Sequence, residues 1–324
     1  MKFENKNIII TGGSRGLGLA LCEEFARQGA NLLLIARDKE ELLKAQSHLN
    51  EKFPERSFFI LSCDLCSASS YKIIHQTALK VFPQVNLIVN NAGAIMVGPF
   101  TSMNEDDFRT QMEIHLFAPL KMIQLFLPDF IKQGSGQIVN ICSMGGKVSV
   151  PNMLTYDASK FALAGLSQGL SAELKEKNIF VTTVYPALMM TGSPIQAVFK
   201  GQHGKSFDWF SCADYMPFVA LPAEKAAKKI VNAAYHKKAE LVIPWFAHLR
   251  VLGSAVFPNL MISTMRLINS FMPKEDSSIY KSGAEAQKEA HFFQKYFYEK
   301  AQKIQQRWNQ SPKSIEKVKQ TVTN

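Results

Sequence analysis

The chain has 324 residues, 47% of them hydrophobic, and 37 Lys and Arg residues outnumber 27 Asp and Glu residues. This composition supplies enough apolar side chains for a folded core and excludes a chain that is disordered throughout. Five cysteines, an odd number, are typical of a reducing compartment and not of a disulfide-stapled secreted fold. The N-terminus has no apolar signal segment, and no uninterrupted apolar run reaches the roughly 18 residues of a membrane span. We therefore expect a cytoplasmic protein.

Two cysteines, Cys63 and Cys66, stand at a spacing that occurs in metal sites. No second cysteine pair and no histidine pair at ligand spacing accompanies them in the sequence. We interpret them as ordinary thiols beside the end of a strand and predict no metal site.

The net charge of +10 is unevenly distributed. Residues 1–219 carry 20 basic and 19 acidic side chains, whereas residues 220–324 carry 17 basic and 8 acidic ones. A basic segment favours an acidic partner such as anionic lipid or nucleic acid, although a solvated charged face is the commoner explanation. The basic residues are interspersed with apolar ones, so we predict no nucleic-acid partner.

Apolar runs of strand length recur through the first two thirds of the chain and alternate with segments that have apolar residues at helical spacing. Continuous apolar strands separated by helices are typical of a parallel sheet covered on both faces. The predicted fold class is therefore α/β, a doubly wound parallel sheet in a single domain over residues 1–245. The first six expected strands are Asn7–Ile10, Asn31–Ile35, Ser57–Leu61, Leu87–Val89, Gln137–Ile141 and Phe180–Val184.

After the sixth strand the pattern loosens. Residues 190–221 contain glycines and prolines among many aromatic side chains. We expect this segment to be a lid over an apolar pocket, with an ordinary surface segment as the alternative. A helix over Ala223–His236 and a last strand over Glu240–Ile243 complete the expected domain.

A C-terminal helical extension is expected over residues 246–308, with one amphipathic helix near Ala286–Trp308. Residues 309–324 are rich in Ser, Lys, Gln and Thr and are predicted to be a disordered tail.

Within this extension, Met261, Met265, Ile268 and Met272 recur at helical spacing. Such helices could pack on the domain or on a second subunit of a homo-oligomer. The alternative is a segment that lies on an anionic membrane surface, because apolar residues accompany basic ones here. The protein would then be peripherally bound to the membrane.

The first strand leads directly into a glycine-rich turn and an amphipathic helix. Such a turn lets the backbone approach a pyrophosphate closely and directs free N–H groups and the helix dipole at its charge. The residues of this turn predicted to bind a cofactor are Gly12, Ser14, Arg15, Gly16, Leu17 and Gly18.

Arg37 follows the second strand, where an acidic residue would bind a ribose 2′-hydroxyl and an arginine a 2′-phosphate. Because Arg15 and Arg37 can converge on a 2′-phosphate, NADP(H) is the preferred cofactor. The alternative is that both arginines are solvated and Asp38 binds the hydroxyl.

Three further residues are candidate catalytic residues. Ser143 ends the fifth expected strand, and Tyr156 and Lys160 lie four residues apart, on one face of an expected helix. A desolvated ammonium beside a phenol should lower the pKa of the phenol and make it a usable proton donor or acceptor near neutral pH.

With these motifs in order, residues 6–243 resemble the short-chain dehydrogenase/reductase family, which has a Rossmann-like fold. The resemblance implies that Tyr156 exchanges a proton with the substrate oxygen, Ser143 positions that oxygen, and Lys160 holds the nicotinamide ribose. It also implies an adenine-contacting acid at Asp64 beside Leu65. The other cofactor contacts implied are Asn91, Ala92, Gly93, Pro186 and Thr191.

Two positions depart from the family pattern. His115 stands where the family has a catalytic asparagine, and Ala187 stands where a glycine usually follows Pro186. His115 could hold the water that links Lys160 to solvent, because imidazole both donates and accepts hydrogen bonds; a buried helix histidine without a catalytic part is the alternative.

The resulting hypothesis is an NADP(H)-dependent enzyme that interconverts a carbonyl and a secondary alcohol on a bulky apolar substrate. The competing hypothesis is a cofactor-binding regulatory or scaffolding protein of the same fold that has lost turnover.

Overall fold

The computed structural model describes residues 1–216 and 220–310. Its centre is a seven-stranded parallel sheet in the order β11-β7-β6-β4-β1-β2-β3. The predicted doubly wound sheet is confirmed, and each of the seven expected strands is present, four of them one residue longer than expected and one of them three residues longer. Their bounds are β1 Asn7–Thr11, β2 Asn31–Ala36, β3 Phe58–Ser62, β4 Leu87–Asn90, β6 Gly136–Ile141, β7 Ile179–Pro186 and β11 Glu240–Ile243.

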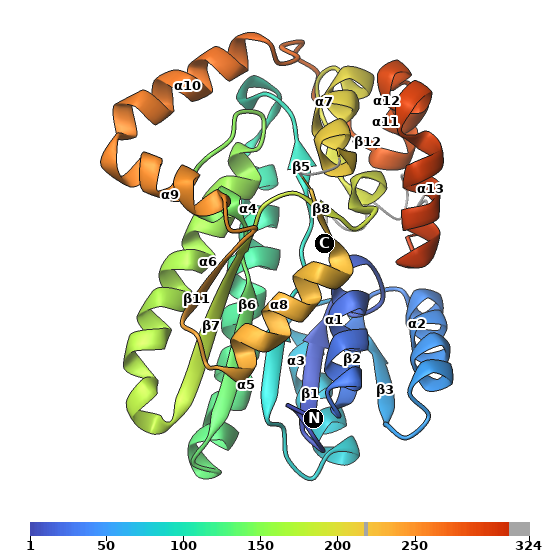
Figure 1. Ribbon diagram of the computed structural model, residues 1–324, viewed down its shortest axis with the longest axis vertical. Helices are drawn as coiled ribbons and strands as arrows, with labels where there is room; N and C mark the ends of the chain where they lie inside the picture. The colour runs from blue at the N-terminus through green and yellow to red at the C-terminus, as the bar shows by residue number, and fades with distance from the viewer. Residues whose placement is uncertain (217–219, 311–324) are drawn as a thin grey trace.

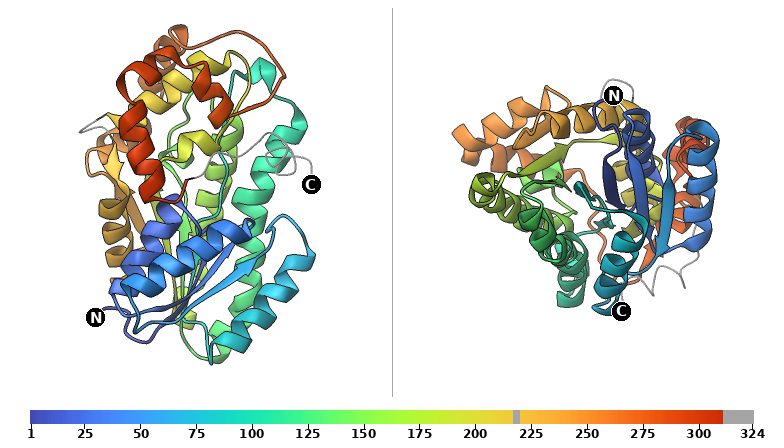
Figure 2. Two further views of the ribbon diagram at one scale, coloured as in Figure 1. Left: turned by 90° about the vertical axis from the view of Figure 1, so that its right-hand side faces the viewer. Right: turned by 90° about the horizontal axis from the view of Figure 1, so that it is seen from below.

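Helices cover both faces of this sheet (Figures 1 and 2). Successive side chains of β1 explain why: Ile8 and Ile10 lie in one apolar core and Ile9 in the other, and each is fully buried. The first core includes α1 (Gly16–Arg27), α2 (Lys39–Lys52) and α8 (Ala223–Tyr235). The second includes α3 (Ser69–Val81) and α5 (Ala118–Lys132).

A long helical run crosses the second face. It comprises α4 (Glu105–Met112), a π-helical turn (Glu113–Phe117) and α5, and it packs beside α6 (Leu154–Glu173). Within the described part of the chain, this run is the single unbroken helix long and apolar enough to cross a membrane. Phe126 and Phe130 are nevertheless buried in the sheet core, as expected of a core helix.

The expected lid, residues 190–221, folds together with the end of the chain. It contains β9 (Val198–Phe199) and α7 (His203–Tyr215). Strand β9 pairs with β5 (Met96–Val97) and β12 (Lys281–Ser282) in a three-stranded sheet. Strand β8 (Met189–Met190) pairs with β10 (Leu221–Pro222).

The prediction of one amphipathic helix near Ala286–Trp308 is wrong. Three shorter helices occupy this region: α11 (Gly283–Lys288), α12 (His291–Tyr296) and α13 (Tyr298–Arg307). They lie beside α7 in Figure 1. The break before α12 has a tertiary cause, because Asp208 of α7 accepts a hydrogen bond from the Phe293 backbone N–H at 2.7 Å. The Phe293 ring is buried against Phe207 and Tyr215.

The prediction of a disordered tail is wrong for its first two residues. Asn309 donates to the Ser14 carbonyl at 2.9 Å, and Gln310 donates to the Thr191 carbonyl at 3.1 Å. The rest of the predicted tail, residues 311–324, lies outside the described residues.

A buried ion pair joins the lid and the C-terminal region to α4. Lys200, directly after β9, lies 2.6 Å from Asp107, and both side chains are 1% exposed or less. Asp107 also accepts a 2.6 Å hydrogen bond from the hydroxyl of Tyr280, which precedes β12. One carboxylate therefore joins α4, the lid and the C-terminal region.

We expect Lys200→Met to destabilise the protein by about 3–5 kcal/mol, because it leaves the Asp107 carboxylate buried without a cation. The double variant Lys200→Met/Asp107→Asn should recover part of this loss, since no unpaired charge remains. The midpoint of chemical denaturation measures both effects. A Lys200→Met variant as stable as the unchanged protein would contradict this interpretation.

Candidate active site

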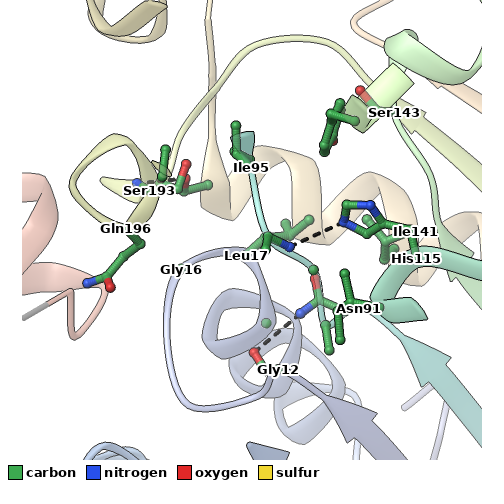
Figure 3. A pocket seen from close by; sticks show the side chains of 18 of the residues that line it. Gly12, Gly16, Leu17, Asn91, Ile95, His115, Ile141, Ser143, Ser193 and Gln196 are labelled. Carbon is green, nitrogen blue, oxygen red and sulfur yellow. Dashed lines mark hydrogen bonds between the residues drawn. The ribbon is translucent and has the colours of Figure 1, made fainter. Parts of the chain in front are cut away.

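A cavity of about 410 Å³ opens at the carboxyl ends of the central strands. It is lined by the glycine-rich turn after β1, by the segments after β2, β3, β4, β6 and β7, and by the lid. Figure 3 shows this cavity from close by. Ligands bind at this edge in open parallel sheets.

The glycine-rich turn requires its glycines. Gly12 and Gly16 have φ values of +67° and +56°, in the left-handed region. A Cβ on Gly18 would lie 1.9 Å from the Gly12 carbonyl oxygen, which no side chain permits. The turn can therefore expose backbone and the start of α1 to an anionic group.

Asn91 fastens the turn to the neighbouring strand β4. Its Nδ2 donates to the carbonyl oxygens of Thr11, at 3.0 Å, and Gly12, at 3.3 Å; Figure 3 shows the latter bond. The Thr11 hydroxyl accepts from the backbone N–H groups of Asn91 and Ala92 in return. Gly93 follows, and a Cβ there would meet the His115 ring at 2.8 Å.

Arg15 and Arg37 both line the outer end of the cavity. Burial lowers the pKa of Arg15, the ion pair with Glu41 raises it, and the nearby Arg37 lowers it again. The Arg15–Glu41 distance is 2.8 Å, and the Ser14 hydroxyl donates to the same carboxylate at 3.2 Å. Asp38 caps α2 by accepting from two backbone N–H groups. The two arginines thus lie close together, as expected for a site that binds an anion.

Asp64 and Leu65 line the cavity beyond β3. The Asp64 carboxylate accepts from the backbone N–H of Cys66 at 3.0 Å, and Leu65 is buried. Cys63 and Cys66 are free thiols whose pKa values burial raises to about 11. A search of residues 1–216 and 220–310 finds no group of three or more His, Cys, Asp or Glu residues placed to hold a metal ion.

Ser143, Tyr156 and Lys160 meet in the same cavity. Ser143 follows β6, while Tyr156 and Lys160 stand on one face of α6. The Ser143 hydroxyl accepts from the Gly145 backbone N–H at 3.0 Å and is hydrogen-bonded to Tyr156. Lys160 Nζ donates to the Ile141 carbonyl at 3.0 Å and lies 5.6 Å from the centroid of the Tyr156 ring.

The expected lowering of the Tyr156 pKa is not found. Burial raises the pKa of the Tyr156 phenol above its usual value, and the hydrogen bond with Ser143 offsets only part of that rise. Burial also lowers the pKa of Lys160 to about 8. Desolvation outweighs the attraction between phenolate and ammonium, so the phenol keeps its proton at neutral pH.

His115 lies in the π-helical turn between α4 and α5 and is 1% exposed. Its Nε2 accepts from the Ala94 backbone N–H at 3.2 Å, so Nδ1 carries the proton and donates to the Ser159 hydroxyl at 2.8 Å. Ser159 in turn donates to the Tyr156 carbonyl at 2.7 Å. Burial lowers the pKa of His115, which is neutral. Both ring nitrogens are therefore engaged by protein groups, an arrangement that suits a positioning role better than a relay through water.

The other departure from the family pattern is accommodated by the backbone. Ala187 follows Pro186 at the end of β7 and is absent from the described non-glycine residues with positive φ, so an alanine fits without strain. Its N–H donates to the Ile243 carbonyl at 2.7 Å. Pro186 and Thr191 line the cavity as expected.

Among the cavity residues that the sequence analysis missed, three come from distant parts of the chain. Asp214 projects from the lid helix α7, Arg250 comes from the C-terminal extension, and Gln310 comes from the predicted tail. Asp214 is 5% exposed, and no hydrogen bond or ion pair to it is found within the described residues. Burial raises the pKa of its carboxyl to about 8. No sequence motif marks these positions, because tertiary packing alone brings them here.

Comparison with known proteins identifies the family. A family model described as short chain dehydrogenase matches residues 6–198, and the chain belongs to this family of oxidoreductases. It is 28% identical over 278 residues to the fatty acyl-CoA reductase of Acinetobacter baylyi, covering 85% of this chain and 88% of that protein. The residues that carried the resemblance therefore identified the family correctly.

Solved structures share the fold. A short-chain dehydrogenase from Streptomyces avermitilis has a TM-score of 0.69 at 26% identity, covering 84% of this chain and 99% of that one. The L-sorbose reductase of Gluconobacter frateurii, complexed with NADPH and L-sorbose, has a TM-score of 0.66 at 23% identity. That match covers 75% of this chain and 97% of that one.

We expect Asp214→Asn to raise the melting temperature at pH 7.5 and to have a much smaller effect near pH 4. The carboxyl has a folded-state pKa of about 8 and an unfolded-state value of about 3.9. The folded state therefore binds more protons, so stability falls as the pH rises from about 4 to 8. Asp214→Asn has no ionisable carboxyl at this position, so its stability should not fall with pH for this reason.

Thermal melts of both proteins at several pH values test this expectation. Glu176→Gln, which alters an exposed carboxylate, is the control. An Asp214→Asn melting temperature at or below that of the unchanged protein at pH 7.5 would contradict the assignment of Asp214 as a costly buried acid.

Proposed function

We propose that the protein is an NADP(H)-dependent oxidoreductase that interconverts a carbonyl and a secondary alcohol on a bulky, mostly apolar substrate. The observation that carries the proposal is the meeting of Ser143, Tyr156 and Lys160 in one cavity with the glycine-rich turn. The cofactor, when bound, would supply or accept the hydride.

The residues around the cavity suit a dinucleotide. The open backbone of Gly12, Gly16 and Gly18 leaves room for a pyrophosphate at the start of α1. Asp64 and Leu65 stand where an adenine would bind, and Lys160 lies deep in the cavity, within reach of a nicotinamide ribose. These positions support the cofactor contacts that the family resemblance implies.

Tyr156 is the general acid for reduction. Its phenol is protonated at neutral pH, so it can donate to a carbonyl oxygen as negative charge develops there. Ser143 would hydrogen-bond the same oxygen and fix its position. Lys160, buried with its ammonium against the Ile141 carbonyl, would stabilise the phenolate that remains after proton transfer.

The preference for NADP(H) rests on Arg15 and Arg37. They lie together at the cavity end that a 2′-phosphate would reach, and Asp38 is engaged in capping α2. Arginine is suited to this task because its planar, permanently charged group can bind phosphate through two bonds. The L-sorbose reductase with the same fold is complexed with NADPH.

An apolar substrate is suggested by the walls beneath the lid. Ile95, Met96, Met153 and Phe210 line the cavity, and all but Met96 belong to the apolar core around the lid helix α7. The related protein of Acinetobacter baylyi is named as a fatty acyl-CoA reductase, which implies a substrate with an apolar acyl chain. Asp214 adds one buried polar group to these walls, a combination typical of pockets that fix the orientation of a largely apolar ligand.

The competing hypothesis of an inactive cofactor-binding protein was motivated by two departures from the family pattern, Ala187 and His115. Ala187 fits its backbone position without strain, and His115 braces the Tyr156 backbone through Ser159. Neither substitution disrupts the proton-transferring group.

We expect Tyr156→Phe to lower kcat by at least about 100-fold, because the transferable proton is removed. NADPH affinity should stay close to that of the unchanged protein, since the ring remains. Initial rates of NADPH oxidation with ketones and aldehydes of graded size, and a fluorescence titration of NADPH, measure the two quantities. Tyr296→Phe, an exposed site, is the control. Retention of most of the rate would refute the proposed role.

We expect Arg37→Asp to lower the ratio of kcat/KM for NADPH to that for NADH roughly 10- to 100-fold. The change removes a charged hydrogen-bond donor and adds a carboxylate that repels a 2′-phosphate. Lys44→Asp, the same charge change on exposed α2, is the matched control. An unchanged protein that prefers NADH would overturn the NADP(H) assignment.

A further inference from the structure

Two helices, α9 (Ala247–Val256) and α10 (Pro258–Ser270), form a hairpin that stands out from the body of the protein, orange in Figure 1. Only Ala247 is buried in α9, and no residue is buried in α10. The large apolar side chains exposed on and beside the hairpin are Trp245, Phe246, Leu249, Leu252, Val256, Phe257, Leu260, Ile262, Leu267, Ile268 and Phe271. An apolar surface this continuous is unusual for a protein face in contact with water alone.

The hairpin has an inner and an outer side. Met261 and Met265 face the body across a groove of about 690 Å³, whose opposite wall includes Leu154 and Phe161. Leu260, Leu267 and Phe271 are 65%, 62% and 83% exposed, and their spacing of seven and four places them along one stripe that runs along α10 to its C-cap residue. The outer stripe is apolar although nothing in the described chain packs on it.

The segment that contains the hairpin, between Glu240 and Glu275, carries only basic charges. From Leu241 to Lys274 the sequence has no Asp or Glu, and its charged residues are Arg250, Arg266 and Lys274. Arg266 and Lys274 are exposed and border the groove, whereas Arg250 lines the catalytic cavity. Basic residues within an apolar surface match the boundary of an anionic bilayer, where each one near the surface adds to binding. Trp245, which is 73% exposed where the hairpin begins, is a residue type enriched at this boundary.

The shape of the hairpin fits a surface better than a span. Helices of 10 and 13 residues are roughly 15 and 20 Å long, short of the roughly 30 Å hydrocarbon core. The two helices are also bent by 118° at the break between them. They can lie in the headgroup region with their apolar side in the acyl chains, but they cannot cross as one helix.

The hairpin adjoins the catalytic cavity. Arg250 of α9 lines that cavity, and Ala247 packs in a core with Tyr185 and Val242 at the carboxyl ends of β7 and β11. Residues 149–154 separate the cavity from the groove under α10, since Val150 and Met153 line the former and Ser149 and Leu154 the latter. A surface bound by the hairpin would thus lie next to the substrate side of the cavity.

We propose that the α9–α10 hairpin docks on the surface of an anionic lipid bilayer through its outer apolar stripe and the exposed basic residues Arg266 and Lys274. Docking places the cavity where a lipid-soluble substrate can enter; this consequence rests on the proposed function, whereas the docking itself does not.

The test is co-sedimentation of the full chain, without cofactor or substrate, with vesicles of phosphatidylcholine alone or mixed with phosphatidylserine. The key variant is Leu260→Ser/Leu267→Ser/Phe271→Ser. Its matched control, Leu43→Ser/Ile73→Ser/Leu79→Ser, alters three apolar residues on α2 and α3 that are 48–50% exposed. Circular dichroism and NADPH titration establish that each variant is folded.

The unchanged protein and the control should bind mixed vesicles at low salt and less at high salt. The hairpin variant should bind at least about 100-fold more weakly, because three large side chains no longer enter the acyl chains. Arg266→Glu should weaken binding to the anionic vesicles roughly fivefold or more. It should have little effect on binding to phosphatidylcholine alone.

Two results would overturn the proposal. One is an unchanged protein that binds neither vesicle at low salt, and the other is a hairpin variant that binds as tightly as the unchanged protein. The unchanged protein could instead bind no vesicles and be a dimer in size-exclusion chromatography, while the hairpin variant is a monomer. That result would assign the stripe to a contact with a second copy of the chain. Reduction of a small soluble ketone is measured separately, so its failure would count against the proposed function and not against docking.

Discussion

The contact between the glycine-rich turn and the loop after β4 is the constraint on which the site depends. Asn91 donates to two carbonyls of the turn, and Gly18 packs against the Gly12 carbonyl so closely that no side chain fits. Strands β1 and β4 are neighbours in the sheet, and the chain leaves them toward opposite faces. Their ends therefore form the floor of one crevice, and the residues after β6 and on α6 complete its wall.

Burial governs the chemistry in this crevice. It keeps the Tyr156 phenol protonated, brings the pKa of Lys160 to about 8 and keeps His115 neutral. A protonated phenol beside a buried cation is suited to giving a proton to a carbonyl oxygen and to leaving a stabilised phenolate. The same environment also buries Asp214, an acid without a partner among the described residues, and this burial disfavours its charged form. Such perturbed groups are concentrated in functional sites.

The sequence predicted the sheet, and it identified the motif residues that meet in the candidate cavity, because both depend on local patterns. The seven strands of the sheet appear as apolar runs, and Tyr156 and Lys160 share a helix face by spacing alone. What it missed is set by long-range packing. Asp208 of the lid interrupts the expected C-terminal helix by binding the start of α12, and Gln310 reaches the cavity across the fold. The predicted direction of the Tyr156 pKa shift was wrong, because a sequence indicates which charge is near the phenol but not how far the phenol is removed from water.

The proposed function requires that this cavity supports hydride transfer between NADP(H) and a carbonyl compound. The most direct measurement is mass spectrometry of the alcohol formed from an apolar ketone with NADPH deuterated at the transferring position. We predict an alcohol that carries one deuterium on its carbinol carbon, formed as NADPH is consumed. An unlabelled alcohol, or bound NADPH that is not consumed with any ketone or aldehyde of a size-graded series, would contradict the account.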